Sequence, residues 1–165
     1  MPIANETLDD ELKMHRSLLP PVGRYHMQLR DEDVPSILSS AILALDNNTL
    51  WGRFQLGVWR GIMVIEPEGG SVWSVDHEFE WFAQDTHDTD EVYNGRGYIK
   101  FARNGFVDGL MDTPIIFEFE GHHVDEEVPD HESDVASMQR EFNRLADLQE
   151  WFITRDPADE PDDEE

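Results

Sequence analysis

The 165-residue sequence contains no cysteine, which excludes disulfide bonds, thiol catalysis and metal sites ligated by cysteine. A cysteine-free chain favours an intracellular location, cytoplasmic or nuclear. The sequence also lacks an apolar run long enough to cross a bilayer, so no membrane contact is predicted. Its first residues, MPIANETLDDELKMHRS, have acids where a secretory signal has a basic segment and an apolar core, and we expect no signal peptide.

Basic residues are scarce, because 12 Lys and Arg stand against 37 Asp and Glu, for a net charge of −25. Such a chain has no basic face that would release counterions from phosphates, so direct binding to nucleic acid is not predicted. Three interpretations of the acidity stay open. They are a solvated surface with a disordered acidic tail, a surface for a basic protein partner, and adaptation to high salt, which the presence of only two lysines would fit.

The clearest structural pattern lies between Tyr93 and Gly121, where three segments alternate apolar and polar residues between turn residues. Asn104-Gly105 is a strong hairpin signal, because a tight turn needs positive φ and these two residue types tolerate it. Asp112-Thr113-Pro114 marks a second turn. One face of this meander is apolar and is made by Ile99, Phe101, Val107, Gly109, Met111, Ile115, Phe117 and Phe119.

Five more segments upstream have strand character: 23–30, 39–46, 49–56, 58–66 and 77–84. Leu50, Phe54 and Leu56 share the face expected in the core, whereas 58–66 is apolar on both faces and is expected to be covered on both sides. With 39% hydrophobic residues the chain suits one folded domain. The pattern predicts a mostly β fold, an antiparallel up-and-down meander closing into a barrel of about eight strands.

Helices are predicted at both ends of the barrel sequence. Thr7 and Asp10 have capping-box spacing before a short N-terminal helix that ends at Pro20-Pro21. Ser133-Asp134 caps an amphipathic helix expected to pack on the barrel mouth or outer wall. Its apolar stripe comprises Val135, Met138, Phe142, Leu145, Leu148 and Phe152. The predicted parts are a helical extension at 1–22, the barrel at 23–121, an acidic loop containing histidines at 122–132, the helix at 133–155 and a disordered acidic tail at 156–165.

Four stretches, LWGRFQLGVWRGIMVIE, YNGRGYIKFARNGFVDGLM, FEFEG and SMQREFN, carry a family resemblance. The sequence resembles a large family of short uncharacterised proteins of filamentous fungi, over residues 50–143 and more weakly at Gly23-Arg24-Tyr25. It departs from the family pattern at Gln55, where an acid is common, and in its long N-terminal extension. The resemblance implies one compact β domain from a fungal cell, and it carries over no activity, cofactor or catalytic residue.

Arg60, Arg96 and Lys100 interleave with Trp59, Tyr93 and Tyr98 on the predicted strands. This pattern suggests binding of an anion with stacking, against the simpler interpretation of cross-strand pairs on an outer face. The candidate ligand-binding residues are Trp59, Arg60, Trp81, Arg96 and Tyr98. Adjacent His122 and His123 would point to opposite faces of an extended chain, so no metal site is predicted. No nucleophile elbow or phosphate loop is present, and we assign no catalytic residue and no cofactor.

Two functional hypotheses follow. The first is a non-enzymatic intracellular β-barrel that serves as a binding module for a basic protein. It rests on the strong negative charge of the chain and on the lack of a recognisable set of catalytic residues. The second is a lipocalin-like barrel that holds a small hydrophobic ligand, with a cyclase or isomerase activity as one form of it.

Overall fold

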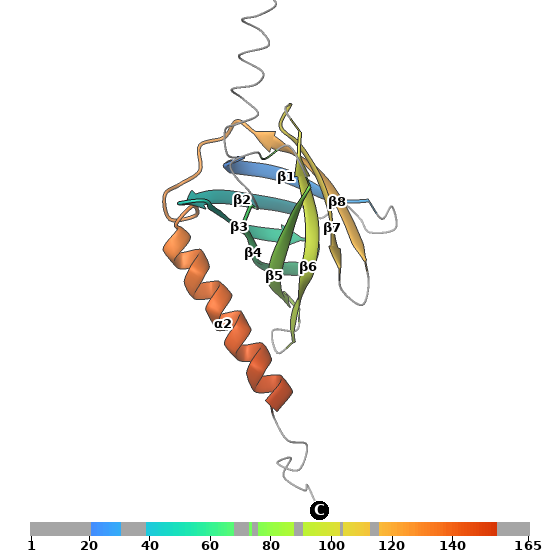
Figure 1. Ribbon diagram of the computed structural model, residues 1–165, viewed down its shortest axis with the longest axis vertical. Coiled ribbons are helices and arrows are strands. Elements are labelled where there is room, and N and C mark those ends of the chain that lie inside the picture. The colour runs from blue at the N-terminus through green and yellow to red at the C-terminus, as the bar shows by residue number, and fades with distance from the viewer. Residues whose placement is uncertain are drawn as a thin grey trace, which may run out of the picture.

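The computed structural model describes residues 21–30, 39–67, 73, 76–87, 91–102, 104–112 and 116–154, with side chains up to Trp151. Within these residues eight antiparallel strands follow one another in sequence order, and the last strand pairs with the first (Figure 1). The predicted eight-stranded meander barrel is thereby confirmed. The predicted N-terminal helix and acidic tail lie outside the described residues.

The strands agree closely with the predicted segments. They are β1 (Gly23–Leu29), β2 (Ser39–Asp46), β3 (Thr49–Leu56), β4 (Trp59–Ile65), β5 (His77–Asp85), β6 (Val92–Phe101), β7 (Phe106–Asp112) and β8 (Phe117–Val124), followed by the helix α2 (Val135–Thr154). Gly105, in the predicted Asn-Gly turn, has a φ of 82°, and Asn47, in the turn between β2 and β3, has a φ of 54°.

The end of β8 differs from the prediction of a loop starting at His122. β8 continues to Val124 because its backbone pairs with β1, with His122 opposite His26 and Val124 opposite Arg24. This pairing closes the barrel and satisfies backbone groups that a loop would leave to water. The polar side chains there are exposed, so hydrophobicity gave no sign of the strand.

The barrel interior is filled by the protein's own side chains. Phe79, Phe119 and other inward residues form one continuous buried cluster. A Cβ added to Gly97 would lie 2.4 Å from the Phe79 ring, and one added to Gly109 would lie 2.6 Å from the Phe119 ring. The rings therefore occupy the space that these glycines leave, as expected for an eight-stranded barrel whose interior is just wide enough for side chains.

Aromatic rings also lie at both ends of the barrel. Trp73, between β4 and β5, is only 4% exposed and its ring centroid lies 5.2 Å from that of His77. At the other end the Trp59 ring meets the Tyr93 ring edge-on at 4.6 Å. These contacts extend the apolar core toward both ends of the barrel.

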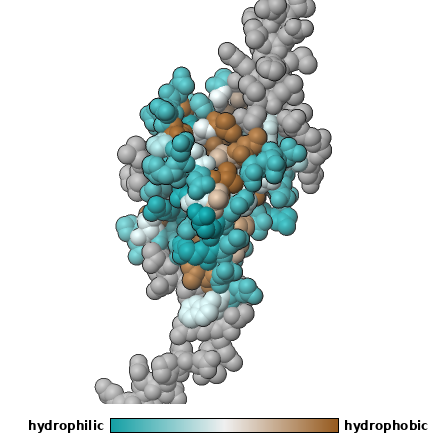
Figure 2. All heavy atoms as spheres, turned by 90° about the vertical axis from the view of Figure 1, so that its left-hand side faces the viewer, coloured by the Kyte–Doolittle hydropathy of each residue, from teal (hydrophilic) through white to brown (hydrophobic). Residues whose placement is uncertain are grey.

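Helix α2 packs on the outer wall of the barrel, one of the two predicted positions, and contacts β2 to β6 (Figure 1). Asp134 caps it, because its Oδ1 accepts a hydrogen bond from the Ala136 amide at 3.2 Å. Met138 is fully buried against Ile42 and Ile62, so β4 is covered on both faces as predicted. The face that carries the helix is mostly hydrophilic, with an apolar patch in its upper half (Figure 2). Within the described chain, no helix has the length and apolar character needed to span a membrane.

Candidate functional site

On the part of the outer wall that α2 leaves exposed, the outward side chains of the barrel form a strongly acidic surface, although α2 also contacts other parts of β5 and β6. We call it the open wall and define it by ten exposed or half-buried residues of β5 to β8. They are Glu78, Glu80, Arg96, Tyr98, Lys100, Asp108, Leu110, Asp112, Glu118 and Glu120. Six of them are acids and two are bases, so the open wall has a negative local charge.

Cross-strand pairing arranges the open wall in rows. Tyr98 lies between Glu78 on β5 and Leu110 on β7, and Leu110 lies opposite Glu118 on β8. Side chains directly opposite one another on one face of a sheet are close enough to interact. The Tyr98 side chain, 52% exposed, therefore stands beside an aliphatic neighbour in a field of carboxylates.

Arg30, just after β1, shows how this surface holds a guanidinium. Its nitrogen atoms lie 3.7 Å from Asp108 Oδ2, 3.6 Å from Glu118 Oε2 and 3.4 Å from Glu120 Oε2. One cation thus interacts with three carboxylates from two strands. Such partly exposed pairs are weak one by one but act together as a network.

Arg96 makes the shortest ion pair of the open wall, with its Nη1 2.7 Å from Glu78 Oε1. The hydrogen bond to Glu78, followed by the charge of that carboxylate, raises the pKa of Arg96. Its cross-strand neighbours Glu80 and Asp112 form no ion pair with any residue that the structure describes. These two carboxylates are therefore available to an external cation.

A shallow hollow of about 320 Å³ opens on this surface. Its charged lining residues are three acids, Asp76, Asp108 and Glu118, and two bases, Arg30 and Lys100, and the Tyr98 ring lies among them. Carboxylates and a phenol ring in one hollow suit a guanidinium or ammonium group, which can stack on the ring while its charge meets the acids.

The five predicted ligand-binding residues do not converge on one site. Trp81 is buried in the interior, where its Nε1 donates a hydrogen bond to the Arg96 carbonyl at 3.2 Å. Trp59 packs at one barrel end, and Arg60 points outward beside α2. Only Arg96 and Tyr98 share a surface, because alternate residues of a strand face opposite sides.

Sequence reasoning missed Arg30, Asp108 and Leu110 on the open wall, and also Arg53 and Arg144, which lie with Arg60 in a second hollow. Cross-strand register and helix placement bring these residues together, and neither follows from a single chain segment. The alternation of Asp108 and Leu110 with the inward row Val107, Gly109 and Met111 was a usable signal for two of them.

The histidines near the end of β8 contact different neighbours. The His122 ring lies 5.9 Å from His26, whereas the His123 ring meets Tyr25 edge-on at 5.3 Å. In the described part of the chain, no three His, Asp or Glu side chains gather closely enough to hold a metal ion.

A scan against family models found no matching family, and searches of curated proteins and of solved structures found no match either.

Proposed function

We propose that this chain is a non-enzymatic binding module whose open wall docks a basic segment of a partner protein. The observation that carries the proposal is the exposed Tyr98 ring, which stands beside Leu110 and among six carboxylates. An arginine or lysine of the partner would stack on Tyr98 while its charge meets the acids around the ring. Tyr98 and Leu110 would supply apolar contact, which charges alone do not.

Arg30 supports this proposal from within the molecule. Its guanidinium already interacts with Asp108, Glu118 and Glu120, so the open wall accepts a cation of the kind that a basic partner would bring. Glu80 and Asp112 are the nearest carboxylates without an intramolecular ion pair among the described residues. We expect them to contribute most of the charge attraction to a partner, because they need not give up a bond first.

The closed eight-stranded barrel is also compatible with a lipocalin-like fold. A small hydrophobic ligand, and a cyclase or isomerase activity on it, would need room that the described interior gives to Phe79, Phe119 and Trp81. We therefore favour the binding module. Its proposed site of action is intracellular, supported by the cysteine-free sequence, and membership of the fungal family stays a prediction.

The test is a titration with a fluorescent poly-arginine peptide, followed by anisotropy at low and at moderate salt. The double variant Glu80→Gln/Asp112→Asn should bind about tenfold more weakly than the wild type at low salt, since two carboxylates that attract the peptide are gone. Tyr98→Ala should weaken binding at both salt concentrations, because stacking on the ring is screened less than charge attraction.

The control is Glu127→Gln/Asp147→Asn, which removes the same charge from exposed positions on the α2 side of the molecule. It should bind the peptide nearly as well as the wild type. If both double variants lose affinity equally, the attraction comes from net charge and the open wall is not the site. Absence of binding at every ionic strength would also contradict the proposal.

A further inference from the structure

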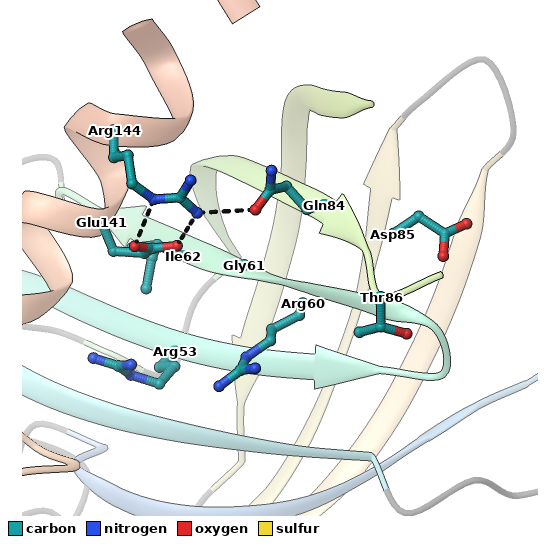
Figure 3. Close-up of a pocket in the computed structure, with 9 residues that line it drawn as sticks. All are labelled: Arg53, Arg60, Gly61, Ile62, Gln84, Asp85, Thr86, Glu141 and Arg144. Atoms are coloured by element: carbon teal, nitrogen blue, oxygen red, sulfur yellow. Dashed lines mark hydrogen bonds and ion pairs between the residues drawn. The ribbon is translucent and has the colours of Figure 1, made fainter. Parts of the chain in front are cut away.

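A second hollow, of about 380 Å³, lies between α2 and the strands β3 to β5 (Figure 3). We call it the helix groove. Arg53 and Arg60 lie on its barrel side, and Glu141 and Arg144 extend into it from the helix (Figure 3). The other lining residues are Gly61, Ile62, Gln84, Asp85 and Thr86. Three of the chain's 12 basic residues thus meet in one hollow of a protein with a net charge of −25.

Arg144 is held by neighbouring side chains, although its own side chain is half exposed. Its Nε and Nη2 donate hydrogen bonds to the two carboxylate oxygens of Glu141 at 3.0 and 2.7 Å, and Nη2 also donates to Gln84 Oε1 at 2.9 Å (Figure 3). This arrangement fixes the Arg144 guanidinium at the upper edge of the groove. Bidentate arginine–carboxylate pairs of this kind hold their geometry well.

Arg53 and Arg60 have unused donors. Arg53 Nη2 donates a hydrogen bond to Ser137 Oγ at 3.1 Å, but its buried Nε has no acceptor among the described residues. Arg60 makes no hydrogen bond or ion pair with any side chain that the structure describes. The two residues sit diagonally on neighbouring strands, since Arg53 pairs with Ile62 and Arg60 pairs with Gln55. Diagonal neighbours on one face are within reach of long side chains.

We propose that the helix groove binds the phosphate group of a small organic phosphate between Arg53 and Arg60. Guanidinium groups match the geometry of phosphate oxygens and keep their charge at every physiological pH. A buried N–H without an acceptor is costly, and a phosphate oxygen would satisfy Arg53 Nε once the side chain turns that atom toward the hollow. The hollow exceeds the size of an inorganic phosphate and falls at the small end of ligand pockets, so it leaves room for an organic part.

Glu141 shows that the helix groove stabilises negative charge. The hydrogen bond from Arg144 lowers the pKa of Glu141, and the charges of Arg53 and Arg60 act in the same direction. Asp85, the other carboxylate of the lining, accepts a hydrogen bond from the His87 amide at 2.8 Å. The distant acids of the chain oppose anion binding only weakly, because salt screens charges beyond about 8 Å in physiological solution.

The experiment is a calorimetric titration of the whole protein at constant ionic strength with inorganic phosphate, phenyl phosphate and benzoate. We expect phenyl phosphate to bind most tightly, because it combines a dianion with an organic part. If inorganic phosphate binds as tightly as phenyl phosphate, the helix groove is a site for the free ion, and the proposal of an organic phosphate is overturned. If benzoate binds most tightly of the three compounds, the helix groove is a carboxylate site, and the phosphate assignment is overturned.

Variants locate the binding. Arg60→Gln should weaken phenyl phosphate about tenfold or more, since a charge-assisted hydrogen bond is lost, while Arg140→Gln, on the same helix as Arg144 but outside the groove, should leave affinity unchanged. Glu141→Gln should strengthen binding, because it removes the competing carboxylate, and a variant that failed to fold would not show such a gain. Equal weakening by Arg60→Gln and Arg140→Gln, or no gain from Glu141→Gln, would overturn the proposal.

This inference is independent of the proposed function. Arg60→Gln lies off the open wall, so it should leave poly-arginine binding intact, and Glu80→Gln/Asp112→Asn should leave phenyl phosphate binding intact. Either site can therefore fail its test while the other passes.

Discussion

Two parts of the barrel wall, the part beneath α2 and the open wall, differ in their outward side chains. Under α2 three outward apolar residues, Ile42, Ile62 and Phe82, are buried. On the open wall, outward positions of the same closed sheet hold Tyr98 and Leu110 among carboxylates. Among the described residues, α2 contacts β5 and β6 but not β7 or β8. The inward rows are apolar on both sides of the barrel. The helix therefore docks where the outward row contains buried apolar residues.

The two walls also differ in the charge that surrounds their hollows. The helix groove combines three bases with two acids, whereas the hollow of the open wall combines Tyr98 with three acids and two bases. Under the two proposals, a molecule with a net charge of −25 would attract a cation at one place and hold an anion at another. The charges that line each hollow determine which sign of ligand it favours, because salt screens the more distant charges of the protein.

A matched pair of substitutions tests the contrast between the walls with the largest expected effect. Ile62 and Leu110 are both outward aliphatic residues, but Ile62 is 1% exposed beneath α2 and Leu110 is half-buried on the open wall. Ile62→Ala should lower the free energy of unfolding by about 2–5 kcal/mol, because it leaves a cavity at the helix interface. Leu110→Ala should change it by about 0.5 kcal/mol, as at most surface positions.

Chemical denaturation with urea, followed by circular dichroism, measures both values. The m value should stay constant in each variant, since the extent of unfolding is unchanged. Equal losses in the two variants would show that the open wall is covered in solution, or that α2 does not hold to its wall.

Phe142 gives the next largest effect and tests the helix side of the contrast. Its ring is half-buried and meets the rings of Trp51 and Phe82 edge-on, at 5.8 and 4.9 Å. Phe142→Ala should cost about 1.5–3 kcal/mol, because apolar burial and two aromatic contacts are lost. This is less than for a fully enclosed ring. A thermal melt equal to that of the wild type would mean that α2 is an exposed docking element.

Most of the fold was predictable because alternation fixes which side of each strand faces the core. Phe79 and Trp81 alternate with Glu78 and Glu80, and the structure places the two aromatic side chains inside the barrel. Sequential hairpins of about eight strands then leave closure as the way to remove sheet edges. The predicted end of the last strand was wrong, because His122 and His123 are polar and only pairing with β1 makes them part of β8.

The site was less predictable, because it depends on contacts between segments that are far apart in sequence. Arg60 and Arg96 were both predicted to bind the ligand, yet Arg60 lies beside α2 and Arg96 lies on the open wall. Arg144 joins Arg60 only through the docking of α2, and Arg30 joins Asp108 and Glu118 only through closure of the barrel. Strand alternation gives the face of a residue but not its cross-strand neighbours.

Arg30 provides a smaller effect that is specific to the open wall. Arg30→Gln should lower the free energy of unfolding by about 1 kcal/mol at low salt, because Asp108, Glu118 and Glu120 lose their shared cation and repel one another. The loss should shrink at high salt, as screening weakens that repulsion. Arg140→Gln, which removes one pair at 3.9 Å, is the matched control and should have a smaller effect. A salt-independent loss would mean that Arg30 acts through packing.

The smallest effect concerns the pH dependence of the helix groove. The Arg144 hydrogen bond lowers the pKa of Glu141 below its ordinary value of 4.5. A carboxylate with a lowered pKa in the folded state stabilises the protein above its unfolded pKa, and this contribution is lost as the pH falls through the folded pKa. Because the pair is partly exposed, we expect a contribution of about 0.3–0.5 kcal/mol.

Carboxyl-carbon NMR titration measures this directly. The pKa of Glu141 should rise in Arg144→Gln, since the largest cause of its lowering is removed, and it should rise less in Arg60→Gln, which acts only through charge. Saturation with phenyl phosphate should also raise the pKa of Glu141 in the wild type, because a second anion in the helix groove opposes its ionisation. No rise with phenyl phosphate would place that ligand elsewhere, and no rise in Arg144→Gln would mean that the ion pair does not persist in solution.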